Sequence, residues 1–256
     1  MDLIGAAAFV SGGASGLGEA TARALAEAGA IVAVADIDDE RGPAVAADIG
    51  GLYVKVDVAD ERAVARGVET TLAETGLALR IAVSCAGIGH AARIVNRAGE
   101  PHPLDIFERV LQVNLVGTFN VMRLAARAMM RCDPLGPDGE RGLLVNTASV
   151  AALEGQTGQV AYAAAKGGVV AMTLPVARDL AVVGIRVCTI VPGTMDTPLF
   201  GRASAELKAS LAKDVLFPRR MGTPDEFGDL VVAMAHNSYL NAEVIRLDGG
   251  LRMPPK

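Results

Sequence analysis

The 256-residue sequence has no tryptophan, three cysteines and three histidines. The cysteines form no CxxC pair and the histidines form no HxxxH pair, so we expect neither a disulfide scaffold nor a bound metal. Isolated cysteines fit a reducing compartment. The first thirteen residues have an acid at position 2 and no basic region, which is unlike a signal peptide. These absences favour a cytoplasmic protein.

Excess positive charge and long apolar runs are also missing. The formal net charge is −5, whereas nucleic-acid-binding proteins usually carry a basic excess, so no nucleic-acid partner is expected. The longest apolar run, residues 167–177, is shorter than the roughly 20 residues that span a bilayer. We therefore expect no membrane attachment and a small molecule as the partner.

The residues that are present alternate between two patterns. Hydrophobic residues make up 51% of the chain and charged residues 21%, which excludes disorder. Seven short apolar segments are predicted to be strands: 5–10, 31–35, 52–56, 80–84, 142–146, 186–191 and 244–247. Six longer segments are predicted to be helices: 16–28, 39–48, 61–74, 104–131, 160–183 and 224–236. This order predicts an α/β protein, one domain over 1–256, with a doubly wound (Rossmann-type) parallel seven-stranded sheet and helices on both faces.

Three stretches depart from the alternation. Residues 94–103 and 133–141 carry proline, glycine and charge, which is typical of surface loops. Residues 196–220 form a longer insertion with a helical stretch at 203–215. Because α/β folds bind ligands outside the carboxyl ends of their strands, we expect this insertion to be a substrate lid.

A glycine-rich turn, SGGASGLG at 11–18, joins the first strand to the first helix. Gly12 permits the tight turn, Gly16 lets the backbone approach a phosphate, and Gly18 lets the helix pack on the strand. The helix N-terminus then presents free N–H groups and the positive end of its dipole to a pyrophosphate. The turn therefore predicts a dinucleotide site.

Two aspartates follow the next strands. Asp36 can accept both hydroxyls of an adenosine ribose and repel a 2′-phosphate, which favours NAD. Its alternative role is a solvated acid that caps the next helix. Asp57 suits the adenine edge, and capping of the helix from residue 60 is an equally good interpretation.

The chemistry is predicted from Ser149, Tyr162 and Lys166. Tyr162 and Lys166 lie one turn apart on one face of a predicted helix, and Ser149 follows a strand thirteen residues earlier. A neighbouring ammonium and a cationic nicotinamide can lower a phenol pKa from about 10 toward working pH. Tyr162 would then exchange a proton with a substrate oxygen, to which Ser149 hydrogen-bonds.

These motifs occur together in the order found in the short-chain dehydrogenase/reductase superfamily, which the whole chain resembles. Longer strings, among them VNLVGTFNV at 113–121 and NTASVAALEGQTGQ at 146–159, are similar to the 3-hydroxyacyl-CoA dehydrogenase type-2 family, also called type 10 17β-hydroxysteroid dehydrogenase. That family is NAD-dependent and usually tetrameric. The resemblance implies an NAD-dependent oxidoreductase of lipid metabolism that forms a homotetramer.

The resemblance also implies site residues. The residues that it places around NAD, together with those of the glycine turn, are Gly12, Ser15, Gly16, Leu17, Gly18, Asp36, Asp57, Val58, Cys85, Ala86, Gly87, Tyr162, Lys166, Pro192, Gly193, Met195 and Thr197. Asn114 is implied to hold a water in a proton relay through Lys166. Ser149 and Tyr162 are implied to touch substrate, and Gln156 and Gln159 could face substrate or the surface.

The implied substrate is a 3-hydroxyacyl-CoA or a hydroxysteroid, with their ketones. Alternatives are a 3-oxoacyl-carrier-protein reductase, which usually prefers NADPH, and a non-catalytic nucleotide-sensing scaffold. Residues 199–220 hold five basic and two acidic side chains, so the lid carries +3. This could be a basic rim for the phosphates of coenzyme A, or an ordinary solvated lid.

The sequence departs from the superfamily at one place beside the site. Ser84 and Cys85 stand where the superfamily often has two asparagines. Ser84 is a shorter hydrogen-bonding group, so it is expected to support the central strand less well. Cys85 is interpreted as a small wall residue rather than as a nucleophile.

Overall fold

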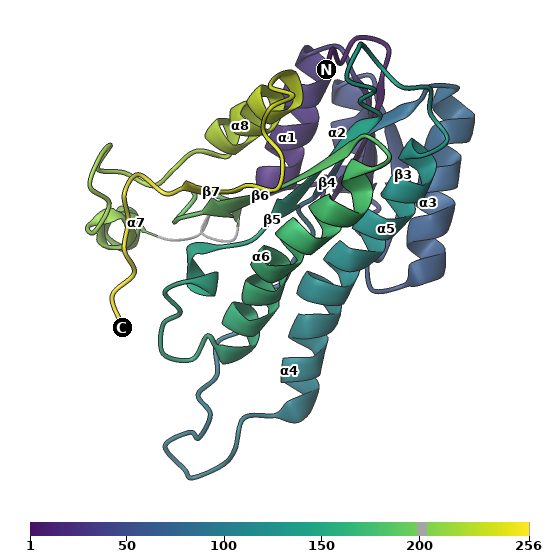
Figure 1. Cartoon of the computed structure of the whole chain (residues 1–256). Coiled ribbons are helices and arrows are strands. Elements are labelled where there is room, and N and C mark those ends of the chain that lie inside the picture. Colours follow the sequence, from purple (N-terminus) through teal and green to yellow (C-terminus); the bar gives the residue numbers. More distant parts are fainter. Residues whose placement is uncertain (199–203, 256) are drawn as a thin grey trace.

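The structure is a computed structural model that describes residues 1–198 and 204–255. Its centre is a parallel sheet with strand order β3-β2-β1-β4-β5-β6-β7 (Figure 1). The strands are β1 (Ala7–Ser11), β2 (Ile31–Asp36), β3 (Leu52–Lys55), β4 (Leu79–Ser84), β5 (Gly142–Thr147), β6 (Ile185–Pro192) and β7 (Val244–Leu247). All seven predicted strands are present, and the predicted fold is confirmed.

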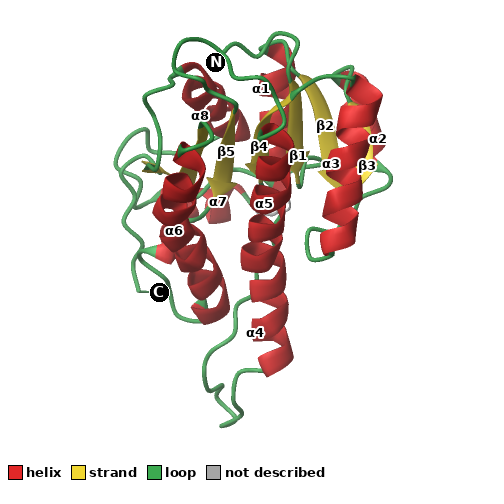
Figure 2. Ribbon diagram, turned by 45° about the vertical axis from the view of Figure 1, so that its right-hand side comes forward, coloured by secondary structure: helices red, strands yellow, loops and turns green. Residues whose placement is uncertain are grey.

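Helices cover both faces of the sheet (Figure 2). The helices of one face are α1 (Gly16–Glu27), α2 (Arg41–Asp48) and α8 (Pro224–His236), which pack into one apolar core. Those of the other face are α3 (Glu61–Thr75), α5 (Gly117–Met129) and α6 (Val160–Ala181), which pack into the second core. Because both faces are covered, strands such as β1 and β5 are buried along their whole length, which explains their continuous apolar sequence.

The predicted helix 104–131 is not one continuous α-helix. It consists of α4 (Leu104–Leu111), a π-helical turn (Gln112–Val116) and α5. A π turn widens the helix locally, and single π turns occur often at functional sites. Val113 and Asn114 are buried in this turn, between the largely exposed α4 and the largely buried α5. Apolar periodicity did not predict this interruption because one wide turn shifts the pattern only slightly.

The lid insertion contains a shorter helix than predicted. Helix α7 (Ala205–Ala212) lies within the expected stretch 203–215, while Leu199, Phe200 and Arg202 lie outside the described residues. The two predicted loops contain only isolated bridges, Val95 with Pro101 and Leu135 with Glu140.

Helix α6 is long and apolar enough to cross a membrane by length and composition. Its contacts suggest another reason for this composition, because it packs against β6 and α4. Such a helix is weak evidence for a membrane span, since core helices have the same character. The same helix carries Tyr162 and Lys166.

Candidate active site

A groove of about 340 Å³ opens at the carboxyl ends of β1, β2 and β4. Twelve of the residues predicted to bind NAD line it: Gly12, Ser15, Gly16, Leu17, Gly18, Asp36, Asp57, Val58, Cys85, Ala86, Gly87 and Thr197. This edge of the sheet is where a doubly wound fold binds its ligands.

The backbone segments of the glycine turn pack as tightly as the sequence predicts. A Cβ atom on Gly18 would lie 2.0 Å from the carbonyl oxygen of Gly12, and one on Gly12 would lie 2.6 Å from the backbone nitrogen of Ala86. Gly12 and Gly16 both have positive φ values, of 69° and 56°. The Ser15 side chain makes no capping hydrogen bond to α1, so the helix N-terminus can offer backbone N–H groups to an anion. These features fit a dinucleotide phosphate.

The carboxylate of Asp36 is held by the backbone. One oxygen accepts from the Ala14 N–H at 2.9 Å. The other accepts from the N–H groups of Ile37 and Asp38 at 2.7 and 3.1 Å. Helix α2 has Glu40 as its N-cap, so Asp36 does not cap that helix. Asp36 instead forms part of the wall of the groove.

Asp57 is not the cap of the following helix either, because Asp60 is the N-cap of α3 and accepts from the Arg62 N–H. One Asp57 oxygen accepts from the Ala59 N–H at 2.9 Å. The adjoining Val58 is held from behind, since its carbonyl accepts from Asn120 Nδ2 at 3.1 Å. Asp57 and Val58 therefore form a braced end of the groove, suited to the edge of a base.

The structure adds groove residues that the sequence analysis missed, and it places some predicted ones elsewhere. The additional lining residues are Ile37, Val56, Ile88, Arg109, Val113 and Pro198. Ile37 and Val113 adjoin the predicted Asp36 and Asn114, which is a usable signal. Arg109 gave none, because its place depends on how α4 is oriented. The predicted cofactor residues that do not line this groove are Tyr162, Lys166, Pro192, Gly193 and Met195.

Ser149, Tyr162 and Lys166 are brought together beside the end of β5. Ser149 caps a 3-10 turn (Val150–Ala152), where its Oγ accepts from the Ala151 N–H. Lys166 Nζ donates to the Thr147 carbonyl at 2.7 Å and lies 5.8 Å from the centre of the Tyr162 ring. The arrangement puts a phenol, a hydroxyl and an ammonium at one point of the sheet edge.

Burial sets the protonation of these groups. It raises the pKa of Tyr162, and a hydrogen bond with the Ser149 side chain acts in the opposite direction. It lowers the pKa of Lys166 to about 8. The sequence analysis expected a neighbouring ammonium together with a cationic nicotinamide to lower the phenol pKa, and in the protein without cofactor the pKa is raised instead. The physical reason is that Lys166 is directed at the Thr147 carbonyl and burial dominates at Tyr162.

Asn114 is fully buried in the π turn. Its Oδ1 accepts from the Ile88 N–H, and its Nδ2 donates to the Ile88 carbonyl, both at 2.8 Å. A Cβ on Gly87 would lie 2.7 Å from Asn114 Oδ1 and 3.7 Å from Lys166 Nζ. Asn114 and Lys166 therefore flank the same glycine, and Asn114 also holds the chain that follows β4.

The side chains of the two predicted glutamines hydrogen-bond to backbone atoms. Gln159 Oε1 accepts from the Gln156 N–H at 2.9 Å, and Gln156 Nε2 donates to the Pro254 carbonyl at 3.0 Å. A contact of either side chain with substrate stays a prediction.

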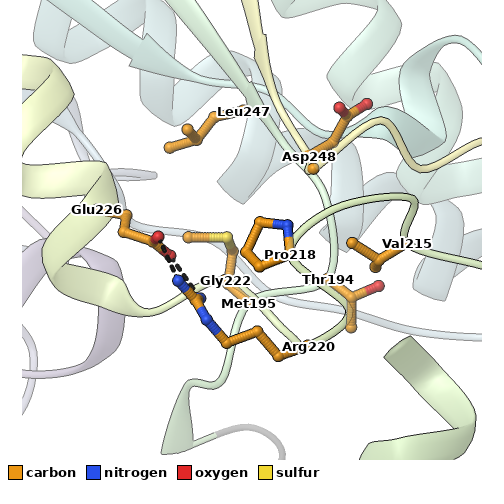
Figure 3. A pocket seen from close by; sticks show the side chains of 10 residues that line it. Thr194, Met195, Val215, Pro218, Arg220, Gly222, Glu226, Leu247 and Asp248 are labelled. Carbon is orange, nitrogen blue, oxygen red and sulfur yellow. Dashed lines mark hydrogen bonds and ion pairs between the residues drawn. The ribbon is translucent and has the colours of Figure 1, made fainter. Parts of the chain in front are cut away.

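Met195 lies in a second cavity, of about 190 Å³, which Thr194 and Val215 also line (Figure 3). Pro218 and Leu247 also line this cavity, and the ion pair between Arg220 and Glu226 borders it. The guanidinium lowers the pKa of Glu226 to about 2.

Ion pairs engage part of the lid's basic charge. Lys208 Nζ contacts both oxygens of Asp196, at 2.7 and 3.1 Å, and Arg220 is bound to Glu226. Two of the five basic side chains counted for the rim are therefore already paired, which weakens the basic-rim interpretation. Over residues 1–198 and 204–255, no cluster of three or more His, Cys, Asp or Glu side chains could hold a metal.

A braced dinucleotide groove beside a serine, a tyrosine and a lysine defines an oxidoreductase that uses a nicotinamide cofactor. A family profile described as "Enoyl-(Acyl carrier protein) reductase" matches residues 12–252. The chain belongs to the short-chain dehydrogenase/reductase superfamily and, within it, to the 3-hydroxyacyl-CoA dehydrogenase type-2 family.

Three similar proteins document this relationship. The 3-hydroxyacyl-CoA dehydrogenase type-2 of Drosophila melanogaster is 47% identical, over 98% of this chain and 98% of that protein. The human protein of the same name is 47% identical, over 98% and 97%. The crystal structure of 3-hydroxyacyl-CoA dehydrogenase type-2 from Mycobacterium avium superimposes with a TM-score of 0.95 at 46% identity and covers 98% of both chains.

Proposed function

We propose that this enzyme interconverts a secondary alcohol and its ketone with NAD, and that the substrate is a 3-hydroxyacyl-CoA or 3-oxoacyl-CoA. The observation that supports NAD most directly is the Asp36 carboxylate, which three backbone N–H groups aim at the groove. A 2′-phosphate would approach this charge, whereas two ribose hydroxyls could donate to it. The names of the similar proteins support the acyl-CoA class.

The nicotinamide supplies a hydride acceptor or donor when it is bound. Around the reacting carbon the chain's own groups handle the proton. Tyr162 is the proposed acid–base group at the substrate oxygen, and Ser149 orients that oxygen by hydrogen bonding. Lys166, which has a pKa of about 8, is positively charged at neutral pH. Its charge, together with that of an oxidised nicotinamide, would favour the phenolate. Asn114 is proposed to hold a water in the proton path behind Lys166.

The test compares four substrates with purified protein by following NADH absorbance: acetoacetyl-CoA, a longer 3-oxoacyl-CoA, a steroid ketone and a simple ketone. Efficient reduction of the CoA thioesters is expected. Exclusive turnover of the steroid would overturn the acyl-CoA proposal, and turnover of none would overturn the proposed activity.

A second candidate is reduction of 3-oxoacyl groups on acyl-carrier protein. A 3-oxoacyl-[acyl-carrier-protein] reductase of Thermotoga maritima is 32% identical over 98% of this chain and 99% of that protein. Asp36 counts against this candidate if the reaction uses NADPH. The same assay with an acyl-carrier-protein thioester separates the two.

We also propose a homotetramer of cytoplasmic location. Leu104 and Phe119 are exposed on α4 and α5, and Leu174 is exposed on α6, which leaves apolar surface on neighbouring helices. Light scattering that finds a monomer at micromolar concentration would contradict the assembly. Residues 196–220 are proposed to act as the lid over the substrate.

A further inference from the structure

Ser149 and Tyr162 are the two ends of one excursion of the chain. Ser149 caps the 3-10 turn Val150–Ala152, residues 153–159 form a loop, and α6 begins at Val160, two residues before Tyr162. The position of this loop therefore influences the separation and orientation of both groups. We call residues 150–159 the catalytic loop.

The catalytic loop is tied to a segment almost a hundred residues away. Glu154 accepts from Arg246 Nη1 and Nη2 at 2.8 and 3.3 Å and from the Met253 N–H at 2.8 Å. Arg252 Nε lies 3.5 Å from the same carboxylate. The Arg246 guanidinium, followed by the Met253 N–H, lowers the pKa of Glu154, which stays ionised at neutral pH.

Further along the loop the backbone makes the same connection. Gln156 Nε2 donates to the Pro254 carbonyl, and both the N–H and the Oγ1 of Thr157 donate to the Pro255 carbonyl, at 3.2 and 3.1 Å. We call residues 248–255 the strut. Asp248 joins it to β7, because its carboxylate accepts from Arg246 Nε at 2.7 Å.

The strut also contacts residues 212–221, which we call the base of the lid. The Gly249 carbonyl accepts from the N–H groups of Leu216 and Phe217 at 3.0 and 3.1 Å. Leu251 is 1% exposed and packs with Ala212, Val215 and Met221 in one apolar cluster. Figure 1 shows the yellow end of the chain running past α7.

Met253 links the two sides. It packs against the lid cluster and also against the cluster that contains Ala148 and Val150, the neighbours of Ser149. The strut thus touches the lid base and the catalytic loop at once. None of the described residues that line the dinucleotide groove belongs to the catalytic loop or to the strut. The strut meets the predicted cofactor residues only at the second cavity, which Asp248 and Gly249 line together with Met195.

We propose that the strut sets the spacing between the lid and the catalytic loop, with Glu154 as the positioning residue, and so determines substrate affinity much more than cofactor affinity. The inference rests on the proposed function, in which substrate is held at Ser149 and Tyr162 under the lid. Because the substrate lies between two walls joined by the strut, loosening one joint enlarges the space and weakens binding.

The experiment uses Glu154→Gln in the full chain, which keeps the shape of the side chain and an acceptor for Met253 but removes the charge that holds Arg246 and Arg252. We expect the KM for acetoacetyl-CoA to rise by about tenfold and the Kd for NADH, from fluorescence titration, to stay within about twofold. The matched control is Glu140→Gln, which removes a carboxylate paired with Arg186 of β6 before β5 begins. That variant should leave the substrate KM unchanged.

Two further variants test the link itself. Deletion of residues 252–256 should raise the same KM. Combining it with Glu154→Gln should raise the KM by less than the product of the two single effects, because both changes weaken the contacts of Glu154 with Met253 and Arg252. Arg252→Ala tests the contact between Arg252 and Glu154 in a chain of full length. Hydrogen exchange should be faster at residues 154–159 in each of these variants.

The outcomes separate the inference from the proposed function. Faster exchange with an unchanged substrate KM, unchanged exchange, or equal losses of substrate and NADH binding would each overturn the strut's role. A wild-type enzyme that turns over no tested ketone would overturn the proposed function instead. The affinity for acetoacetyl-CoA, measured by calorimetry, would then replace the KM in the comparison of the variants.

Discussion

Lys166 Nζ lies 5.8 Å from the centre of the Tyr162 ring and donates its hydrogen bond to the Thr147 carbonyl. Only 4% of this lysine is exposed. Burial deprives the ammonium of water and leaves it one carbonyl partner, so the charged form is disfavoured and the pKa of Lys166 drops to about 8. The ionisation of Lys166 is therefore sensitive to any charge placed beside it.

The first prediction concerns stability and pH in the absence of cofactor. Folded Lys166 loses its proton near pH 8, whereas the unfolded chain keeps it to about pH 10.5. Between these values the unfolded state binds more protons, so the free energy of unfolding of the wild type rises with pH. Lys166→Met lacks this titration. Its stability relative to wild type should fall, by on the order of 3 kcal/mol, across that window.

Urea unfolding at several pH values measures this difference. A difference between the two proteins that stays constant from below pH 8 to about pH 10.5 would show that burial does not shift the lysine.

The second prediction concerns the proton carrier. Tyr162→Phe removes the phenol oxygen and little volume, so kcat should fall by about 100-fold or more while NADH still binds. Tyr239→Phe is the matched control, because Tyr239 is fully exposed in the segment after α8 and should change nothing. Steady-state kinetics and an NADH titration check both variants. Activity of Tyr162→Phe within about threefold of wild type would refute the proposed proton transfer.

The third prediction concerns cofactor choice. Repulsion between the Asp36 carboxylate and a 2′-phosphate is worth roughly 1–4 kcal/mol, so kcat/KM with NADH should exceed that with NADPH by at least about tenfold. Asp36→Ala should narrow the gap, mainly by weakening NADH. Asp38→Ala is the control, since Asp38 accepts from the N–H groups of Glu40 and Arg41 at the start of α2. Equal wild-type efficiency with both cofactors would remove the NAD assignment.

Much of the fold could be predicted because its signals are local. A strand covered on both faces must be apolar throughout, so β1 and β6 appear in the sequence as unbroken runs. The glycine turn is equally local, since the contact between Gly12 and Gly18 spans only six residues. Asp36 and Asp57 could be predicted as site residues because each comes directly after a predicted strand.

The rest depends on contacts that no local pattern encodes. Whether Lys208 is free or paired is decided by Asp196, twelve residues earlier in the chain and outside α7. The π turn that buries Asn114 changes one helical turn and barely disturbs the periodicity. Glu154 gave no signal at all, because its partners lie about 92 to 99 residues further along the chain.

The last prediction follows from an orphaned atom in the sheet. Asn146 Oδ1 is buried without a hydrogen-bond partner among the residues that the structure describes, while Asn146 Nδ2 donates to the sulfur of Met122 at 3.1 Å. Ser84 lies beside Asn146 in the register of β4 and β5. A buried acceptor without a donor costs about 1–3 kcal/mol. The short serine thus supplies no hydrogen bond to this oxygen, at a position where the superfamily often has asparagine.

Ser84→Asn should place an amide donor next to that oxygen and raise the free energy of unfolding by about 1 kcal/mol. Ser84→Ala is the control, because it changes the same position, supplies no donor and leaves the oxygen orphaned. Urea unfolding without cofactor measures both variants. Ser84 is 4% exposed, so a larger side chain also has to fit. If Ser84→Asn is no more stable than Ser84→Ala, the missing donor is not what limits the stability of this part of the sheet.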